Sequence, residues 1–170
     1  MSEDQLLTFG EVSIALAGFA GIIATFQSRG QPTRSRGDVL GLTTMVTMAL
    51  AVAAMSVVPI AIKNFGISES SVWAGCSLIF ALIYVVFLLF IRSRMVETNM
   101  RGANRIIIIC WWAYNFLVVL ALLTNVTATD VQRQYGIYFV ALLNPLFFSG
   151  YMFVRLLLRP LWRDVRNNKA

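Results

Sequence analysis

The sequence predicts an all-α integral membrane protein, a bundle of five transmembrane helices. Two observations of composition and pattern support this fold. Hydrophobic residues make up 58% of the 170 residues and charged residues only 13%, whereas soluble domains have about 45–50% apolar and about 25% charged residues. A soluble globule of this size leaves too much surface exposed to hide that excess. Its apolar surface therefore requires lipid as a second solvent.

The second observation is the length of the apolar segments. A helix needs about 20 largely apolar residues to span the hydrocarbon core. Each candidate segment is continuously apolar and does not alternate, which favours helices over barrel strands. We expect one transmembrane domain over residues 1–170, with a basic tail over 159–170. The predicted spans are 6–26, 39–62, 72–91, 106–126 and 136–158.

The first segment, 6–26, differs from the others because it contains Glu11 and many glycine and alanine residues. A charged carboxylate at a helix centre costs about 2.5–3.5 kcal/mol on insertion scales. The alternative fold therefore has four spans plus a re-entrant or interfacial first helix. The acidic N-terminus lacks the basic region of a signal peptide, so we expect the first segment to remain in the mature protein.

Prolines and a capping residue refine two of the later segments. Asp38 precedes the segment 39–62 and is predicted to cap it. Pro59 removes a backbone donor and leaves a carbonyl free one turn earlier, near Met55. Pro145 does the same in the segment 136–158, near Ala141. Such a proline can bend the helix and expose backbone to a cavity, so these groups either line a polar path or take part in helix packing.

The positions of the basic residues predict the orientation. With five spans, one side carries Lys63 and Arg133 alone, and the other twelve basic residues lie on the opposite side. Lysine and arginine are enriched in cytoplasmic loops. We expect the arginine side and the C-terminus in the cytoplasm, the N-terminus outside, and the plasma (inner) membrane as the location. The twelve are Arg29, Arg34, Arg36, Arg92, Arg94, Arg101, Arg105, Arg155, Arg159, Arg163, Arg166 and Lys169.

Composition also argues against several function classes. The chain has no histidine, which removes imidazole metal ligands and the usual base of a catalytic triad. Cys76 and Cys110 lie near opposite membrane faces, about 20 Å apart along the normal, so we predict two free buried thiols. We expect no enzyme activity, no cofactor and no metal. The net charge of +6 collects at the membrane ends, where it favours anionic lipid over nucleic acid.

Glu11 is the one acidic residue inside a predicted span, and an intramembrane ionisable group is a functional candidate by default. It lies five residues from the start of its segment, about 7 Å deep. On a helical wheel it shares a stripe with residues that would leave room beside it for water, an ion or a partner side chain, namely Ala15, Gly18, Ile22 and Thr25. One hypothesis is a cation or proton site facing a cavity. The other is a structural carboxyl that is protonated, or is paired with a backbone donor or with Lys63.

Two amides, Asn115 and Asn144, lie deep in the last two segments. An amide in hydrocarbon needs a hydrogen-bond partner, and interhelical bonds of this kind contribute about 0.6–2 kcal/mol. The two asparagines either hold helices together or line a polar path. With Glu11 and Thr25 they form our candidate ion or proton site.

The opposite side of the first segment is a ladder of small residues at spacings of three and four. Small residues let helix backbones approach closely, and van der Waals packing holds helices together in lipid. The packing partner is either another helix of this chain or a symmetry mate. The ladder comprises Gly10, Ser13, Ala17, Ala20, Gly21 and Ala24.

Four arginines follow one helical side of the C-terminal region, which Pro160 is expected to interrupt. We predict an amphipathic extension that contacts anionic lipid, with a cytoplasmic docking surface as the alternative. These arginines are Arg155, Arg159, Arg163 and Arg166. At the opposite boundary, Trp73, Tyr135 and Tyr138 are predicted to be interfacial anchors.

Two hypotheses of function follow. The first is a homo-oligomeric conduit for a cation or proton, with Glu11 as the charged intramembrane group. The second is a structural or accessory subunit without transport activity, which binds another membrane protein or anionic lipid. The expected partners are the lipid bilayer, anionic lipids, and further copies of the chain or another membrane subunit.

Overall fold

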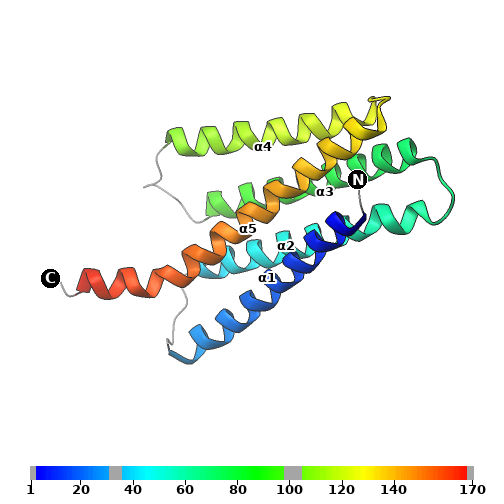
Figure 1. The fold of residues 1–170 in the computed structure, drawn as a ribbon. Coiled ribbons are helices and arrows are strands. Elements are labelled where there is room, and N and C mark those ends of the chain that lie inside the picture. The colour runs from blue at the N-terminus through cyan, green and yellow to red at the C-terminus, as the bar shows by residue number, and fades with distance from the viewer. Residues whose placement is uncertain (1–2, 31–35, 98–104, 168–170) are drawn as a thin grey trace.

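The computed structural model confirms the five-helix bundle and describes residues 3–30, 36–97 and 105–167 (Figure 1). Side chains are described for residues 3–25, 39–94, 108–155 and 157–158. Each helix is long and apolar enough to cross a membrane, so the chain is an integral membrane protein by length and composition. The helices are α1 (Glu3–Gly30), α2 (Arg36–Lys63), α3 (Glu69–Glu97), α4 (Arg105–Val126) and α5 (Val131–Asn167).

Helices α2, α3 and α5 form the centre of the bundle, because each contacts the other two. Helix α1 packs on α2 and α5, and α4 packs on α3 and α5. Helix α5 crosses the bundle obliquely and extends beyond it toward the C-terminus (Figure 1). We call the end with the N-terminus and Lys63 the Lys63 end. The arginine end is the other, where α1, α3 and α5 finish.

The main core lies in the half of the bundle nearer the Lys63 end, where α2, α3 and α5 meet. Aromatic rings fill it: Phe80 and Tyr138 have ring centroids 6.0 Å apart in an edge-on arrangement. The buried residues of this cluster are Leu6, Val52, Met55, Val72, Trp73, Cys76, Phe80, Ala81, Leu122, Tyr135, Tyr138, Ala141 and Leu142. A second cluster, around Tyr84 and Ile91, continues toward the arginine end.

Helix α1 uses its small residues to approach α2. A methyl group built on Gly10 would lie 3.7 Å from the Ser56 Cβ and 3.9 Å from the Ala53 carbonyl oxygen. Ser13 and Ala20 are fully buried on the same side. The predicted ladder thus faces the bundle over most of its length, and in this chain its packing partner is α2. Gly21, also part of the ladder, is exposed.

The helix ends correct two expectations. Helix α2 begins at Arg36, so Asp38 lies inside the helix and is not its N-cap. Helix α5 continues to Asn167, so Pro160 does not end it. A cap that was not predicted is present at the start of α5, where the Asp130 carboxylate accepts the Gln132 N–H at 3.0 Å.

The predicted interfacial anchors at the Lys63 end are also wrong, because their rings lie inside the bundle. Trp73 is 7% exposed, Tyr135 is 6% exposed and Tyr138 is fully buried. Trp73 packs edge-on against Tyr135 with centroids 5.1 Å apart. Both cysteines are free as expected, but only Cys76 is buried, and Cys110 is exposed.

Candidate functional site

Glu11 lies on the exposed side of α1, opposite the side that packs on α2. Within the described part of the chain, no hydrogen bond or ion pair involves its carboxylate. Leu7 and Ile14, one turn to either side, are 44% and 60% exposed. The carboxylate therefore projects from an apolar helix surface that would face lipid in an isolated chain.

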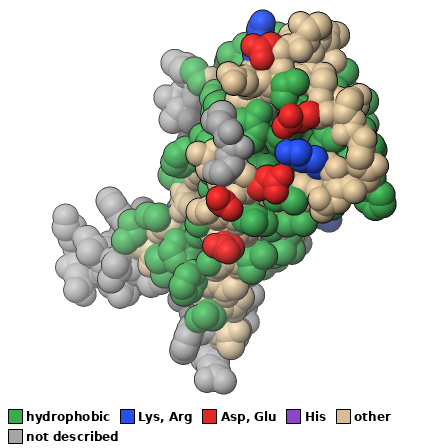
Figure 2. Space-filling view, turned by 45° about the vertical axis from the view of Figure 1, so that its right-hand side comes forward, with side chains coloured by type: hydrophobic (Ala, Val, Ile, Leu, Met, Phe, Trp, Pro, Cys, Tyr) green, Lys and Arg blue, Asp and Glu red, His purple; other side chains and the backbone are tan. Residues whose placement is uncertain are grey.

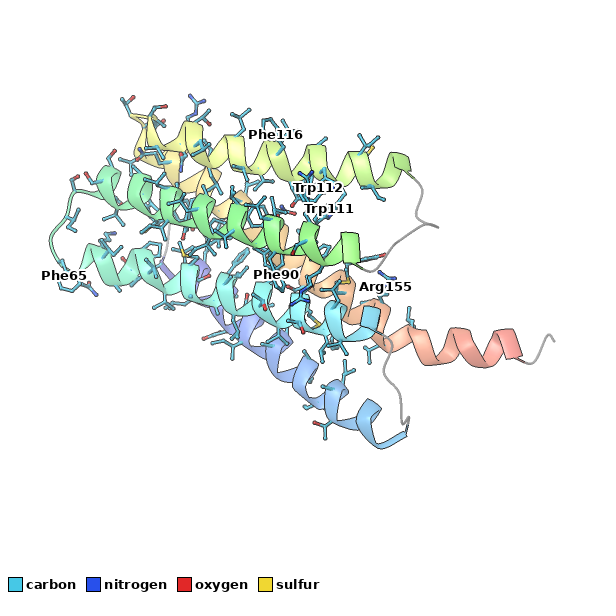
Figure 3. All side chains as sticks on the ribbon, turned by 180° about the vertical axis from the view of Figure 1, so that it is seen from behind. Phe65, Phe90, Trp111, Trp112, Phe116 and Arg155 are labelled. Atoms are coloured by element: carbon cyan, nitrogen blue, oxygen red, sulfur yellow. The ribbon has the colours of Figure 1, made fainter. Side chains whose placement is uncertain are left out.

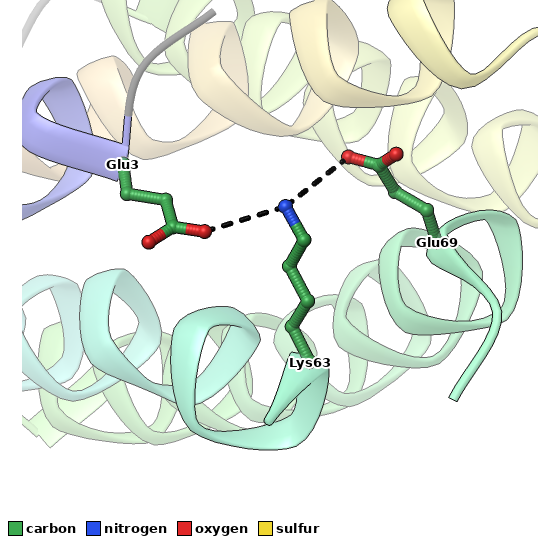
Figure 4. A network of polar contacts seen from close by, with 3 residues as sticks. All are labelled: Glu3, Lys63 and Glu69. Atoms are coloured by element: carbon green, nitrogen blue, oxygen red, sulfur yellow. Dashed lines mark hydrogen bonds and ion pairs between the residues drawn. The ribbon is translucent and has the colours of Figure 1, made fainter. Parts of the chain in front are cut away.

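Lys63, one of the two partners considered for Glu11, is engaged elsewhere. Its ammonium group lies 3.3 Å from a carboxylate oxygen of Glu3 and 3.6 Å from one of Glu69 (Figure 4). This three-residue network joins the ends of α1, α2 and α3. The side chains are about half exposed, so water weakens these attractions. They therefore contribute little to stability.

Asn115 and Asn144 meet inside the bundle through Tyr84, which sequence reasoning did not single out. The Tyr84 hydroxyl donates to the Asn115 Oδ1 and accepts a hydrogen bond from the Asn144 Nδ2 at 2.7 Å. The Asn115 Nδ2 also donates to the Trp111 carbonyl at 2.6 Å. One hydroxyl thus bridges α3, α4 and α5. All three polar side chains are at most 9% exposed.

The free carbonyl predicted near Pro59 has found a partner. The Tyr138 hydroxyl donates to the Met55 carbonyl at 2.5 Å, four residues before the proline. In lipid an unsatisfied backbone carbonyl is costly, so this bond compensates the donor that Pro59 lacks. It also links α5 to α2 at the centre of the main core.

A third polar network closes the Lys63 end. The Asn125 Nδ2 donates to the Ser77 Oγ at 2.7 Å and to the Gln134 carbonyl at 2.8 Å. The Gln134 Nε2 in turn donates to the Ala128 carbonyl at 2.6 Å. These bonds tie the turn between α4 and α5 to α3. The amides here hold helix ends together and are fully buried.

The four residues of the candidate ion site are not brought together. Asn115 and Asn144 lie in the interior, whereas Glu11 and Thr25 lie on the outer side of α1. The Thr25 hydroxyl donates to the Gly21 carbonyl of its own helix at 2.9 Å. Fourteen residues separate Thr25 from Glu11, about 21 Å along the helix. The amides and the carboxylate therefore belong to different parts of the molecule.

No protein family model, curated protein or solved structure matches this chain. Its function must be inferred from the arrangement of its own residues. Among the side chains that the structure describes, no three acidic, cysteine or histidine residues lie close enough to hold a metal ion.

The predicted lipid contact is described at one position. Arg155 is exposed and lies toward the arginine end of α5, far from Phe65 at the turn between α2 and α3 (Figure 3). Tyr151 and Leu158 beside it are 61% and 44% exposed. A cation next to exposed apolar groups suits the boundary between headgroups and acyl chains. The side chains of Arg159, Arg163 and Arg166 lie outside the described residues.

Tyr84 was the buried polar residue with the weakest signal in the sequence. It stands within a continuously apolar segment and looks there like one more large core residue. A buried tyrosine hydroxyl usually finds a partner, and that rule, applied together with the two deep asparagines, is the signal that points to it. Which amide it meets depends on how α3, α4 and α5 are rotated about their axes.

Proposed function

We propose that this protein is an accessory membrane subunit, which assembles laterally with another membrane protein through the outer side of α1. The observation that carries this proposal is the position of Glu11: an unpaired carboxylate on an exposed, apolar helix surface. A charge at the centre of a membrane-spanning helix costs about 2.5–3.5 kcal/mol, and a charge on an apolar surface nearer the end of the span is still unfavourable in lipid. A protein that covers this surface removes the charge from lipid.

The glycines of α1 support the same proposal. A methyl group built on Gly18 would meet nothing within 4 Å, and the residue lies two turns from Glu11 on the same side. Small residues on an exposed transmembrane surface let a second helix approach closely. Gly10, in contrast, already contacts α2. Helix α1 thus has one side packed against its own bundle and one side that is exposed.

The conduit hypothesis has less support from the described residues. The buried amides Asn115 and Asn144 hydrogen-bond to Tyr84, which favours helix packing over a polar path. On α1, the surface between Glu11 and Thr25 is lined by apolar side chains such as Ile14 and Ile22. An ion that left Glu11 would cross about 21 Å of α1 without another side chain to coordinate it.

The proposed orientation follows the positive-inside rule. The arginine end lies in the cytoplasm, where the exposed Arg155 meets anionic lipid. The N-terminus and Lys63 lie outside. Glu11 is then eight residues from the start of α1, about 12 Å along the helix, in the outer half of the membrane. A partner must present its complementary group in that half.

The test compares two exposed glycines. We would extract the protein from its native membrane in lipid nanodiscs and measure the mass of its complexes, using wild type, Gly18→Leu and Gly75→Leu. Gly75 is an exposed glycine of α3 with nothing within 4 Å of a built methyl group, and it serves as the matched control. We expect wild type and Gly75→Leu in a larger complex and Gly18→Leu as a single chain.

Two outcomes would contradict the proposal. One is a wild-type protein that stays a single chain in nanodiscs, or a Gly18→Leu complex as large as that of Gly75→Leu. The other is a complex made only of copies of this chain, together with ion flux in proteoliposomes that Glu11→Gln changes. The second outcome would establish the conduit instead.

A further inference from the structure

The exposed side of α1 has a defined chemistry, which we call the Glu11 face. Its apolar members are 44% to 60% exposed, and Glu11 is its one ionisable group. Figure 2 shows acidic side chains that extend from the neighbourhood of a basic one into a hydrophobic surface. The face comprises Leu7, Glu11, Ile14, Gly18, Ile22 and Thr25.

We propose that the partner covering the Glu11 face is a transmembrane helix that carries a lysine or arginine at the depth of Glu11. This inference rests on the proposed function, because it names the chemistry of the partner that the function requires. Each charge alone is costly in lipid. Paired across a helix interface, the carboxylate and the cation neutralise one another in a medium of low dielectric constant.

A second copy of this chain complements the face poorly. Among the side chains that the structure describes, the basic ones lie toward the two ends of the bundle, and Lys63 already pairs with Glu3 and Glu69. In a two-fold dimer of parallel α1 helices, the same residue of each copy meets near the axis. Glu11 would then meet Glu11, and like charges repel. A cation at this depth must come from a different chain.

The geometry of α1 limits how the partner approaches. Gly18 has open space beside it, and it lies seven residues from Glu11, about 10 Å along the helix. A helix crossing at Gly18 can pass close to the backbone while its basic side chain reaches Glu11. The interface thus combines one charge pair with one close backbone contact, which sets both register and depth.

The experiment uses synthetic transmembrane peptides as probes. The full-length protein, labelled at its N-terminus, is reconstituted in phosphatidylcholine vesicles with an acceptor-labelled leucine–alanine peptide. The peptide carries lysine, leucine or glutamate at the depth of Glu11. Energy transfer measures binding. We expect the lysine peptide to bind about tenfold more tightly than the leucine peptide, the ratio that corresponds to about 1.4 kcal/mol.

Variants of the protein separate charge from packing. Glu11→Gln should remove the preference for the lysine peptide, and Glu11→Lys should reverse it in favour of the glutamate peptide. Gly18→Leu should weaken binding of every peptide, while Gly75→Leu leaves binding unchanged. Circular dichroism of each variant verifies that the helices are intact.

Three results would overturn the inference. The first is equal binding of the lysine and leucine peptides to wild type. The second is a Glu11→Lys variant that does not prefer the glutamate peptide. The third is energy transfer between two labelled populations of the protein that exceeds the transfer with the lysine peptide. The last result would make a second copy the occupant. If the peptides fail while Gly18→Leu still splits the native complex, the accessory function stands and only the basic partner is wrong.

Discussion

Replacing Tyr84 by phenylalanine removes one hydroxyl and two hydrogen bonds that join three helices. The Asn115 Oδ1 loses its donor, and the Asn144 Nδ2 loses its acceptor 2.7 Å away. Interhelical bonds in membranes contribute about 0.6–2 kcal/mol each. Because both amides are buried, water cannot replace the lost partner. We therefore expect Tyr84→Phe to lower the free energy of unfolding by about 1–4 kcal/mol.

The assay is reversible unfolding in mixed micelles with increasing sodium dodecyl sulfate, followed by tryptophan fluorescence and circular dichroism. The matched control is Tyr151→Phe, because Tyr151 is 61% exposed and its hydroxyl contributes nothing to the interior networks. We expect the control to change the unfolding free energy by less than about 0.5 kcal/mol. Equal free energies of unfolding for the two variants would refute the role of Tyr84 as the bridge between α3, α4 and α5.

Three further predictions concern helix contacts. Tyr138→Phe should lower the free energy of unfolding by about 1 kcal/mol. The loss should be much smaller in a Pro59→Ala background, because the new backbone N–H bonds the Met55 carbonyl. Equal losses in both backgrounds would contradict this prediction. Gly10→Leu should cost about 1–3 kcal/mol because it overpacks the contact with α2, as measured by the same unfolding assay. Lys63→Met should leave the unfolding midpoint unchanged, since the ion pairs of Lys63 are exposed. A shift of the midpoint as large as that of Gly10→Leu would contradict this prediction.

Much of the fold was predictable because lipid imposes simple rules. The five spans follow from segment length and composition alone, and every predicted segment lies within one helix. Caps were harder to place. Asp38 follows the start of α2 instead of preceding it. The aromatic residues Trp73 and Tyr138 were assigned to the membrane boundary by depth, but depth does not tell whether a ring points to lipid or to the core.

The candidate site was predicted only in part for the same reason. Asn115 and Asn144 were expected to bond other helices or line a path, and the bridge through Tyr84 is visible only in three dimensions. Glu11 and Gly10 were placed on opposite sides of the first segment by helical periodicity, and that division holds in the structure. Gly21 is exposed although it lies only about 20° around the helix from the buried Gly10, so helical periodicity alone did not predict its exposure.

The sequence by itself determined that the chain enters a membrane, that it does so with five helices, and that all of its arginines except Arg133 collect at one end. These properties are read along one dimension, from composition, length and charge. The tertiary structure decided which side of each helix faces its neighbours. Helices α2, α3 and α4 are apolar all around, and in lipid an apolar pattern does not distinguish core from surface. Only the packed bundle therefore showed that Tyr84 of α3 and Asn115 of α4 lie in the interior.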